Sequence, residues 1–367
     1  MQDPVLLYHA FPGERQRCSR KGLLPSFSWT GLLILLSLAS CRKNLYQDKS
    51  LDNKLVILAE ITAEETLKIP VSKSILVGSG SIITFEKVGG AKVTVTEEGS
   101  PPWNLPVNNS SLYASDPATV YTSPRRPVYE KAYDLRVEEP SLGVATARVE
   151  IPGPVTITHF DTSGELRMGN PVLKCHITVA DPAGAPSFYI IEAVKQLLVT
   201  RHFFYWQGVR YDYDKDAGKK LYEQVRNNPG VSLLRDTVPT GKLQRLNIFT
   251  EDNNTDNAKV GSLDSVFERI FLPDDGFNGQ SYSTTFSIER KYFKAGKPGD
   301  EGRVLIQFKS ASPELYNYLF WYAQYKTDVG YIPSGQLYSP PGNIANGLGI
   351  FGGSSKRQWI YYFDPLW

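Results

Sequence analysis

Three carboxylates on alternate residues form the most conspicuous group that could do chemistry. Asp212, Asp214 and Asp216 occupy the first, third and fifth positions of a calcium-loop pattern, which uses such oxygens as ligands. The sixth position, where that pattern needs glycine, is Ala217, and Lys215 between the carboxylates opposes a dication. They are therefore weak calcium candidates. We expect no metal or other cofactor and favour a solvated acidic turn between a strand and a short helix.

A thiol is the second possible reactive group. Cys175 alternates with Lys174 and His176 in a strand-like run, on the same face as Ile177 and Val179, so we expect a buried structural thiol. The alternative is a nucleophile activated by a histidine that the fold brings close. The histidines available for this role are His159, His176 and His202.

Aromatic residues are densest in the run from His202 to Trp206. In a strand, alternation directs Phe203 and Tyr205 to one face and Phe204 and Trp206 to the other, and one face must be core. Phe204 and Trp206 are therefore a candidate aromatic platform for a sugar or a partner. Packing against a neighbouring loop or domain is the alternative.

The glycine-rich segment Gly347–Gly352 formally matches the dinucleotide pattern G-x-G-x-x-G. That pattern needs a following helix and strand, and the short remainder is strand-like, so dinucleotide binding is excluded. The glycines allow close backbone approach, which also suits a contact with a partner protein. The candidate partner contacts are Gly349, Phe351, Gly352 and Trp359, and a plain core strand is the alternative.

The elements that must position these residues come from a chain of 367 residues, 41% of them hydrophobic, which can bury a substantial core. The net charge is +2, and the two excess positive charges lie in residues 1–40, which hold four basic and two acidic residues. The remainder is neutral, which argues against binding to nucleic acid. No serine nucleophile, zinc or phosphate-loop motif occurs, and we expect no enzymatic activity.

The N-terminal segment is typical of an export signal. Basic residues precede the apolar run Trp29–Ala39, which is too short to span a membrane as a helix. Leu38-Ala39-Ser40-Cys41 resembles the processing site of bacterial lipoproteins, so we expect removal of residues 1–40 and anchoring to the membrane through acyl chains on Cys41. The alternative is an ordinary signal peptide with an incidental cysteine.

The rest of the chain predicts a mostly β fold. After a lipidated cysteine and tether at 41–53, we expect an immunoglobulin-like β-sandwich at 54–153 and a second β domain at 154–367. One helix, 313–326, should pack at the C-terminal end, because Ser312 can cap it and Pro313 suits its first turn. Its expected buried face is Leu315, Leu319, Tyr322 and Tyr325.

Several segments together resemble a family of Bacteroidota outer-membrane lipoproteins with a domain of unknown function, commonly encoded beside TonB-dependent receptors. The resemblance spans about residues 41–363. Besides the Cys41 site, it is carried by the segments 54–61, 91–95, 133–137, 145–152, 275–282, 315–325 and 343–352. It implies a two-part β lipoprotein and assigns no catalytic residues.

The leading functional hypothesis is a binding or scaffold lipoprotein that assists a TonB-dependent outer-membrane receptor in nutrient uptake or assembly. The resemblance implies this partner and an outer-membrane location, without identifying the ligand. In that family, an acidic segment associated with export to the cell surface often follows the cysteine, whereas Arg42 and Lys43 follow Cys41 here. The sequence therefore does not decide between the periplasmic face and the cell-surface face of the outer membrane. The alternative is a secreted hydrolase acting on glycans, with the aromatic run as its platform.

Overall fold

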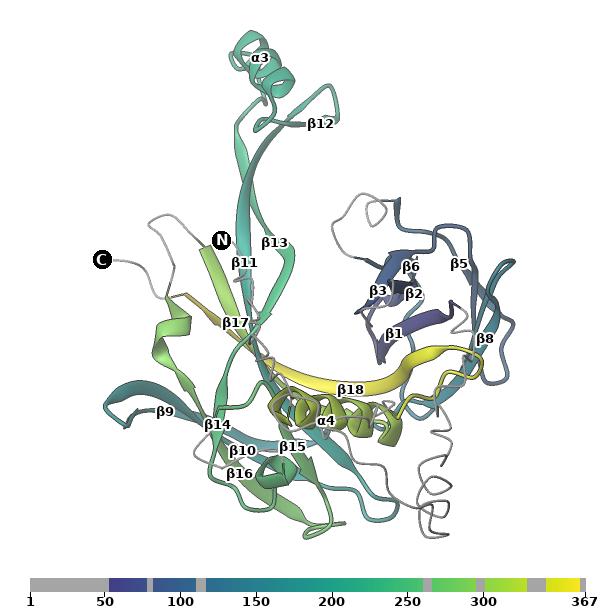
Figure 1. Cartoon of the computed structure of the whole chain (residues 1–367). Helices are drawn as coiled ribbons and strands as arrows, with labels where there is room; N and C mark the ends of the chain where they lie inside the picture. The colour runs from purple at the N-terminus through teal and green to yellow at the C-terminus, as the bar shows by residue number, and fades with distance from the viewer. Residues whose placement is uncertain are drawn as a thin grey trace, which may run out of the picture. The chain divides into compact units, whose positions relative to one another are not determined.

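β-strands make up most of the described chain in the computed structural model (Figure 1). The described residues are 53–77, 82–109, 117–259, 266–294, 301–328 and 341–363. The predicted leader 1–40, Cys41 and nearly all of the predicted tether lie outside them. Residues Asp52–Trp367 form one unit by contact.

The first strands of the chain belong to a two-sheet sandwich. They are β1 (Leu55–Thr62), β2 (Leu67–Val77), β3 (Ile82–Lys87), β4 (Lys92–Glu97), β5 (Trp103–Leu105), β6 (Thr119–Ser123), β7 (Ala132–Glu139) and β8 (Gly143–Glu150). One sheet has the order β5-β4-β7-β8, and β1, β2, β3 and β6 belong to the other. A shared core fills the space between them, with Ile57, Ile69, Val95 and Leu135 all buried. The predicted sandwich is confirmed.

The second part consists of longer strands. They are β9 (Ile157–Arg167), β10 (Asn170–Ala180), β11 (Phe188–Trp206), β12 (Val209–Asp212), β13 (Leu234–Arg245), β14 (Ile248–Thr250), β15 (Ile270–Pro273), β16 (Ser281–Glu289), β17 (Glu301–Ala311) and β18 (Leu348–Tyr362). A sheet ordered β14-β16-β10-β9 packs on β11, β15 and β17. Their core includes Cys175, Ile191, Phe286 and Phe308. Short 3-10 turns, η2 (Asp256–Lys259) and η3 (Arg290–Phe293), follow β14 and β16.

Strand β18 joins the two parts. It pairs in parallel with β1 of the sandwich and antiparallel with β17 of the second part, so both belong to one ten-stranded sheet in the described residues. Buried residues up to Ile151 lie in the core of the sandwich and those from Val155 onward mainly in the second core, but Ile344 and Phe351 also lie in the core of the sandwich. The C-terminal segment therefore completes the first part as well as the second.

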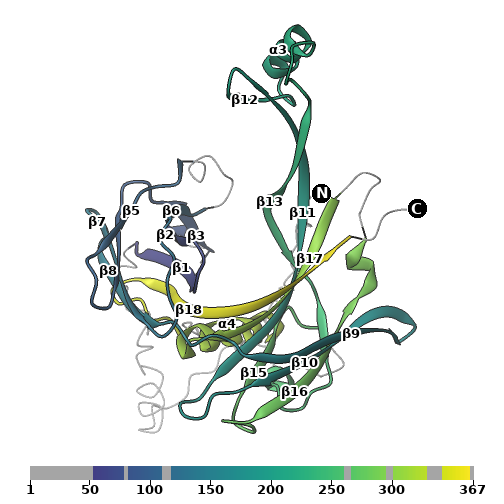
Figure 2. The same ribbon diagram turned by 180° about the vertical axis from the view of Figure 1, so that it is seen from behind.

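The predicted C-terminal helix is present as α4 (Pro313–Asp328) and lies on the face of the large sheet opposite the second core (Figure 2). The Ser312 hydroxyl accepts a hydrogen bond from the Leu315 backbone N–H, at 3.4 Å, as a cap should. Leu315 and Tyr316 are buried, with Leu319 and Phe320 packed beside them. The predicted place of Tyr322 on the buried face is wrong, because its side chain is exposed.

A two-stranded arm extends from the large sheet. The first half of β11 pairs with β17 and β15, and its second half pairs with β13 and then with β12. Helix α3 (Asp216–Val225) covers the end of the arm (Figure 1). The turn at Gln207 and Gly208, both with positive φ, connects β11 to β12. The aromatic run from His202 to Trp206 thus lies in the outer half of the arm.

Candidate functional site

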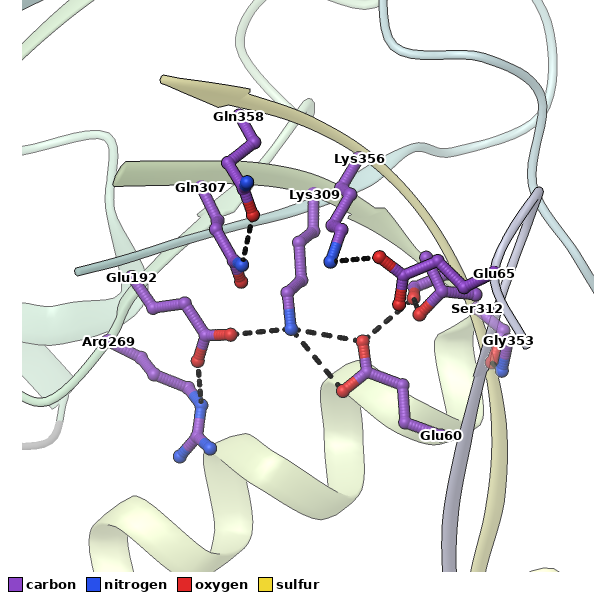
Figure 3. A network of polar contacts seen from close by, with 12 residues as sticks. Glu60, Glu65, Glu192, Arg269, Gln307, Lys309, Ser312, Gly353, Lys356 and Gln358 are labelled. Carbon is purple, nitrogen blue, oxygen red and sulfur yellow. Dashed lines mark hydrogen bonds and ion pairs between the residues drawn. The ribbon is translucent and has the colours of Figure 1, made fainter. Parts of the chain in front are cut away.

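A buried ionic network lies where the base of the arm meets the sandwich (Figure 3). Lys309 of β17 stands at its centre, and its ammonium group contacts Glu192 of β11 at 2.5 Å and Glu60 of β1 at 3.0 Å. Alternation explains the placement, since residues flanking Glu60, Glu192 and Lys309 point into the apolar cores on the other face. Three strands distant in sequence are therefore linked through one ammonium group.

Two guanidinium groups complete the network. Arg269 and Arg245 both donate to Oε2 of Glu192, at 3.2 and 3.3 Å. The side chains of Glu192 and Arg269 are almost inaccessible to solvent, whereas Arg245 is half exposed. The buried part carries two carboxylates and two cations and is neutral, which is the condition for stable burial of charge.

Burial and pairing act in opposite directions on the ionisable groups. Burial favours the neutral form of Glu192, but Lys309, Arg269 and Arg245 outweigh it and hold the pKa of the carboxyl well below its usual range. Burial likewise acts against charge on Lys309, and the two glutamates raise the pKa of its ammonium group above its usual value. These groups stay ionised near neutral pH, so the network holds the fold together instead of exchanging protons.

Hydroxyl groups extend the network into β18 and the start of α4. The Ser354 hydroxyl donates to Glu60 at 2.7 Å and hydrogen-bonds to the Thr62 hydroxyl at 3.0 Å. One residue earlier, the Gly353 backbone N–H donates to the Ser312 cap of α4 at 3.3 Å. These hydrogen bonds thereby link the base of the arm, the sandwich and α4 to one another.

The arm presents an apolar stripe on one face. In β11, Leu197, Val199 and Tyr205 alternate toward that face, and Leu234 of β13 joins them through its pairing with Phe203. All four are exposed, between 40% and 47%. We call these four residues the arm stripe. Arg201, which is also exposed, lies between Val199 and Tyr205 on the same face. Exposed apolar side chains that share one face are typical of a surface that another molecule covers.

The candidate aromatic platform is wrong for Phe204. Its side chain is fully buried, because Tyr211 of β12 stacks on it at 5.5 Å and Tyr222 of α3 meets it edge-on at 5.1 Å between ring centroids. Trp206 is half-buried at the end of the strand. The face predicted to stack on a sugar is therefore the one that α3 packs on.

The candidate partner contacts in the glycine-rich segment lie mainly in the interior. Phe351 is fully buried in the sandwich core, and a Cβ at Gly352 would lie 2.6 Å from that of Leu315 in α4. Gly349, with φ of +104°, lies against the Ile57 carbonyl of the parallel neighbour β1. Trp359 stacks on Phe160, with 3.9 Å between ring centroids. The alternative interpretation, a core strand with close backbone approach, is correct for this segment.

The acidic residues of the calcium-like pattern are engaged within the arm. Asp214 accepts from the backbone N–H of His202 at 2.8 Å and contacts its ring at 3.1 Å, and Asp212 pairs with Lys215 at 3.4 Å. Asp216 begins α3. Among the residues that the structure describes, no three potential metal ligands cluster.

Cys175 is buried in the second core, as predicted. Burial raises the pKa of its thiol to about 12, and the charge of Asp161 adds to that shift, so the reactive thiolate is scarce at neutral pH. Its strand neighbour on β9 is Thr162, whereas His176 faces Asp161 and His159 pairs with Thr178. His202 belongs to the arm and contacts Asp214.

An open groove of about 840 Å³ lies on the outer face of the β5-β4-β7-β8 sheet. Two of its three cations are paired with carboxylates of the lining: Arg136 contacts Glu138 at 2.6 Å, and Arg148 contacts Asp134 at 2.7 Å. Lys92 is the third cation of the lining. Exposed pairs of this kind contribute little, and the groove shows no cluster of one charge sign that would select a charged ligand.

Sequence reasoning missed the ionic network. A usable signal was present, since Glu60, Glu192 and Lys309 each interrupt a strongly apolar strand, where a charge is rarely buried without a partner. That signal does not indicate which of these charged residues pair with one another. Glu60 and Lys309 are separated by 249 residues in the chain.

These features define a mostly β protein in which a sandwich and a second β part share one sheet. The chain belongs to the family described as Domain of unknown function (DUF4249), whose model matches residues 45–359. The predicted membership of a family with a domain of unknown function is thereby confirmed. No curated protein matches the chain by sequence.

One similar solved structure is that of the Enterococcus faecalis MSCRAMM ACE, which binds its ligands by the collagen Hug model. The identity is 10% and the TM-score 0.19, over 86% of this chain and 95% of that chain. A similarity this low carries no argument about the fold or the ligand. Within the described residues, no helix is both long enough and apolar enough to cross a membrane.

Proposed function

We propose that this protein is an outer-membrane lipoprotein, anchored through acyl chains on Cys41, that acts as a binding or scaffold accessory of a TonB-dependent receptor. The observation that carries the proposal is the arm stripe, Leu197, Val199, Tyr205 and Leu234, on a ribbon that leaves the sheet. The lipoprotein processing pattern around Cys41 and the family resemblance supply the membrane context.

The construction of the arm supports contact with a partner. From Gln196 to Trp206, β11 extends for roughly 35 Å at the usual rise of a strand. An isolated two-stranded ribbon is marginal in water, and this one begins directly beyond the ionic network at Glu192. The base is rigid and the ribbon is long and partly apolar, so the arm is suited to contact a second protein at a distance from the large sheet.

Membrane anchoring strengthens this argument. A protein held at a membrane by acyl chains meets its membrane partner at a raised effective concentration, so a modest interface suffices. Four exposed apolar side chains are enough to form the centre of such an interface, because a few residues carry most of the binding energy.

The arm is tested by co-purification after mild detergent extraction, followed by mass spectrometry. We expect the wild type to recover an integral outer-membrane receptor, and Val199→Ser combined with Tyr205→Ser to recover at least about tenfold less. Phe85→Ser, on β3 and exposed to a similar extent at 43%, is the matched control. Equal recovery from all three proteins, or no receptor from the wild type, would contradict the proposal.

The anchor is tested separately with Cys41→Ala and radiolabelled palmitate. Removing the thiol removes the acylation site, so we expect no incorporated label, with the protein either soluble or unprocessed. Continued labelling and retention of the variant would show that the anchor assignment is wrong.

A further inference from the structure

The turn between β9 and β10 carries two of the most exposed apolar side chains in the described chain. Leu166 is 73% exposed and Met168 is 76% exposed. Both figures show this hairpin turn extending at an edge of the molecule (Figures 1 and 2). Neither residue contributes to the core of the second part, so packing does not explain why they are apolar.

The backbone conformation of this turn also disfavours methionine at position 168. Arg167 pairs with Asn170 across a two-residue loop, Met168 and Gly169, in which φ is +48° and +79°. Such a loop favours asparagine or glycine at its first position, and a long side chain at positive φ is strained. Met168 is therefore unfavourable both for the turn and for its exposure to water, and strain of this kind often accompanies function.

A basic hollow lies beside the same turn. It has a volume of about 520 Å³ and is lined by Asn170, Pro171, Glu289, Arg290, Lys291 and Lys294. The pairing of Val172 with Glu289 brings the start of β10 against the segment that carries these cations. Lys291 contacts Glu289, which leaves Arg290 and Lys294 as the excess positive charge of the lining.

Other charges near the turn are balanced. Arg167 lies over the Phe249 ring at 4.2 Å and 3.9 Å from Glu251, and Lys174 pairs with Glu165 at 3.2 Å. The local excess of positive charge thus lies in the hollow, directly beside the apolar tip. An apolar tip with adjacent cations is complementary to a lipid surface, whose acyl boundary accepts the tip and whose phosphates accept the cations.

We infer that this hairpin is a membrane-docking element: Leu166 and Met168 enter the surface of an anionic lipid bilayer, and Arg290 and Lys294 bind its phosphate headgroups. The element lies outside the arm and is independent of the proposed receptor. It would hold the second part at the bilayer surface in addition to the acyl chains expected on Cys41.

The test measures binding of the expected mature chain, residues 41–367, to vesicles that contain no protein. The chain carries Cys41→Ser and lacks residues 1–40, so that neither lipidation nor the apolar run Trp29–Ala39 contributes. We expect it to sediment with vesicles of phosphatidylglycerol and phosphatidylcholine, to bind vesicles of phosphatidylcholine alone more weakly, and to be released as ionic strength rises.

Two variants separate the contributions. Leu166→Ser combined with Met168→Ser should weaken binding by at least about tenfold, because each buried apolar side chain contributes about a factor of ten. Arg290→Gln combined with Lys294→Gln should remove the preference for the anionic vesicles, at about fivefold for each cation. Phe85→Ser on β3 and Lys68→Gln on β2, both exposed, are matched controls and should bind like the parent chain.

Met168→Asn distinguishes docking from folding. Asparagine suits the turn, so this variant should melt at a higher temperature than the parent chain and yet bind anionic vesicles more weakly. No sedimentation of the parent chain, or equal binding by the tip variants and their controls, would overturn the inference. Competition by inorganic phosphate with full retention of binding in the tip variants would also overturn it, since it would indicate a site for free phosphate.

Discussion

Lys309→Met should be the most informative single change in the ionic network. It removes the ammonium group between Glu60 and Glu192 and keeps the aliphatic bulk. Arg269 and Arg245 still pair with Glu192, but Glu60 loses its cation and faces a second carboxylate. Removing one partner of a buried ion pair costs about 3–5 kcal/mol of unfolding free energy.

The expected change in melting temperature follows from the size of the unit. For the residues Asp52–Trp367, the usual unfolding entropy per residue converts that loss into a decrease of about 5–8 °C. The matched control is Lys73→Met, which breaks the exposed pair with Glu86 at 3.1 Å. An exposed pair contributes at most about 1 kcal/mol, so this control should change the melting temperature little.

The pH dependence of stability provides an independent check that the ionic network causes the loss in Lys309→Met. Burial acts against ionisation of Glu60, but Lys309 prevails and lowers the pKa, and the pKa of Glu192 is lowered as well. Carboxylates with lowered pKa stabilise the fold above their ordinary pKa of about 4.3 and lose that contribution as pH falls through the folded value. Lys309, with its raised pKa, contributes fully below about pH 10.4 and loses its contribution only above that.

The difference between wild type and Lys309→Met should therefore be largest at neutral pH and shrink as the pH falls, because Glu60 of the variant, buried beside Glu192 without its cation, takes up a proton at a higher pH than Glu60 of the wild type. Adding Glu60→Gln to Lys309→Met should restore part of the stability, because it removes the unpaired carboxylate. Thermal melts from neutral to acidic pH measure both effects. A loss below about 1 kcal/mol, or an equal loss at acidic and neutral pH, would refute the network's role.

Four further predictions follow from single residues. Phe351→Ala should lower the unfolding free energy by about 3–5 kcal/mol in denaturant titration, because it leaves a cavity in the sandwich core. Gly218→Ala should increase amide exchange in α3 while the sandwich stays protected, since its Cβ would lie 1.9 Å from the Asp212 carbonyl oxygen. Cys175 should react with a thiol reagent at pH 8 far more slowly than a free cysteine of pKa about 8.5, because the pKa of its thiol is raised to about 12. Calcium should leave the melting temperature unchanged relative to chelator, because Asp214 is engaged by His202, and a rise of several degrees that Asp214→Ala abolishes would contradict this.

The strand pattern of the sandwich and the helix that begins after Ser312 could be predicted from local sequence, because alternation and capping act over a few residues. Other elements were missed. Strand β2 contains Pro70, which weakens a strand prediction, and β9 is largely exposed and lacks a clear apolar face. The aromatic run from His202 ends at Trp206, where a turn with positive φ at Gln207 leads into β12.

The sequence by itself determined the mostly β class, the buried character of Cys175 and the exclusion of a dinucleotide fold at Gly347, since each depends on neighbours along the chain. Only the tertiary structure decided that Phe351 completes the sandwich core, that α3 covers Phe204, and that Lys309 joins Glu60 to Glu192. These contacts connect segments far apart in the chain, as in the pairing of Ala59 with Phe351 and of their neighbours, which are 292 residues apart. Local propensity carries no information about such pairings, because parallel pairing between distant strands is selected by the packing of the whole core.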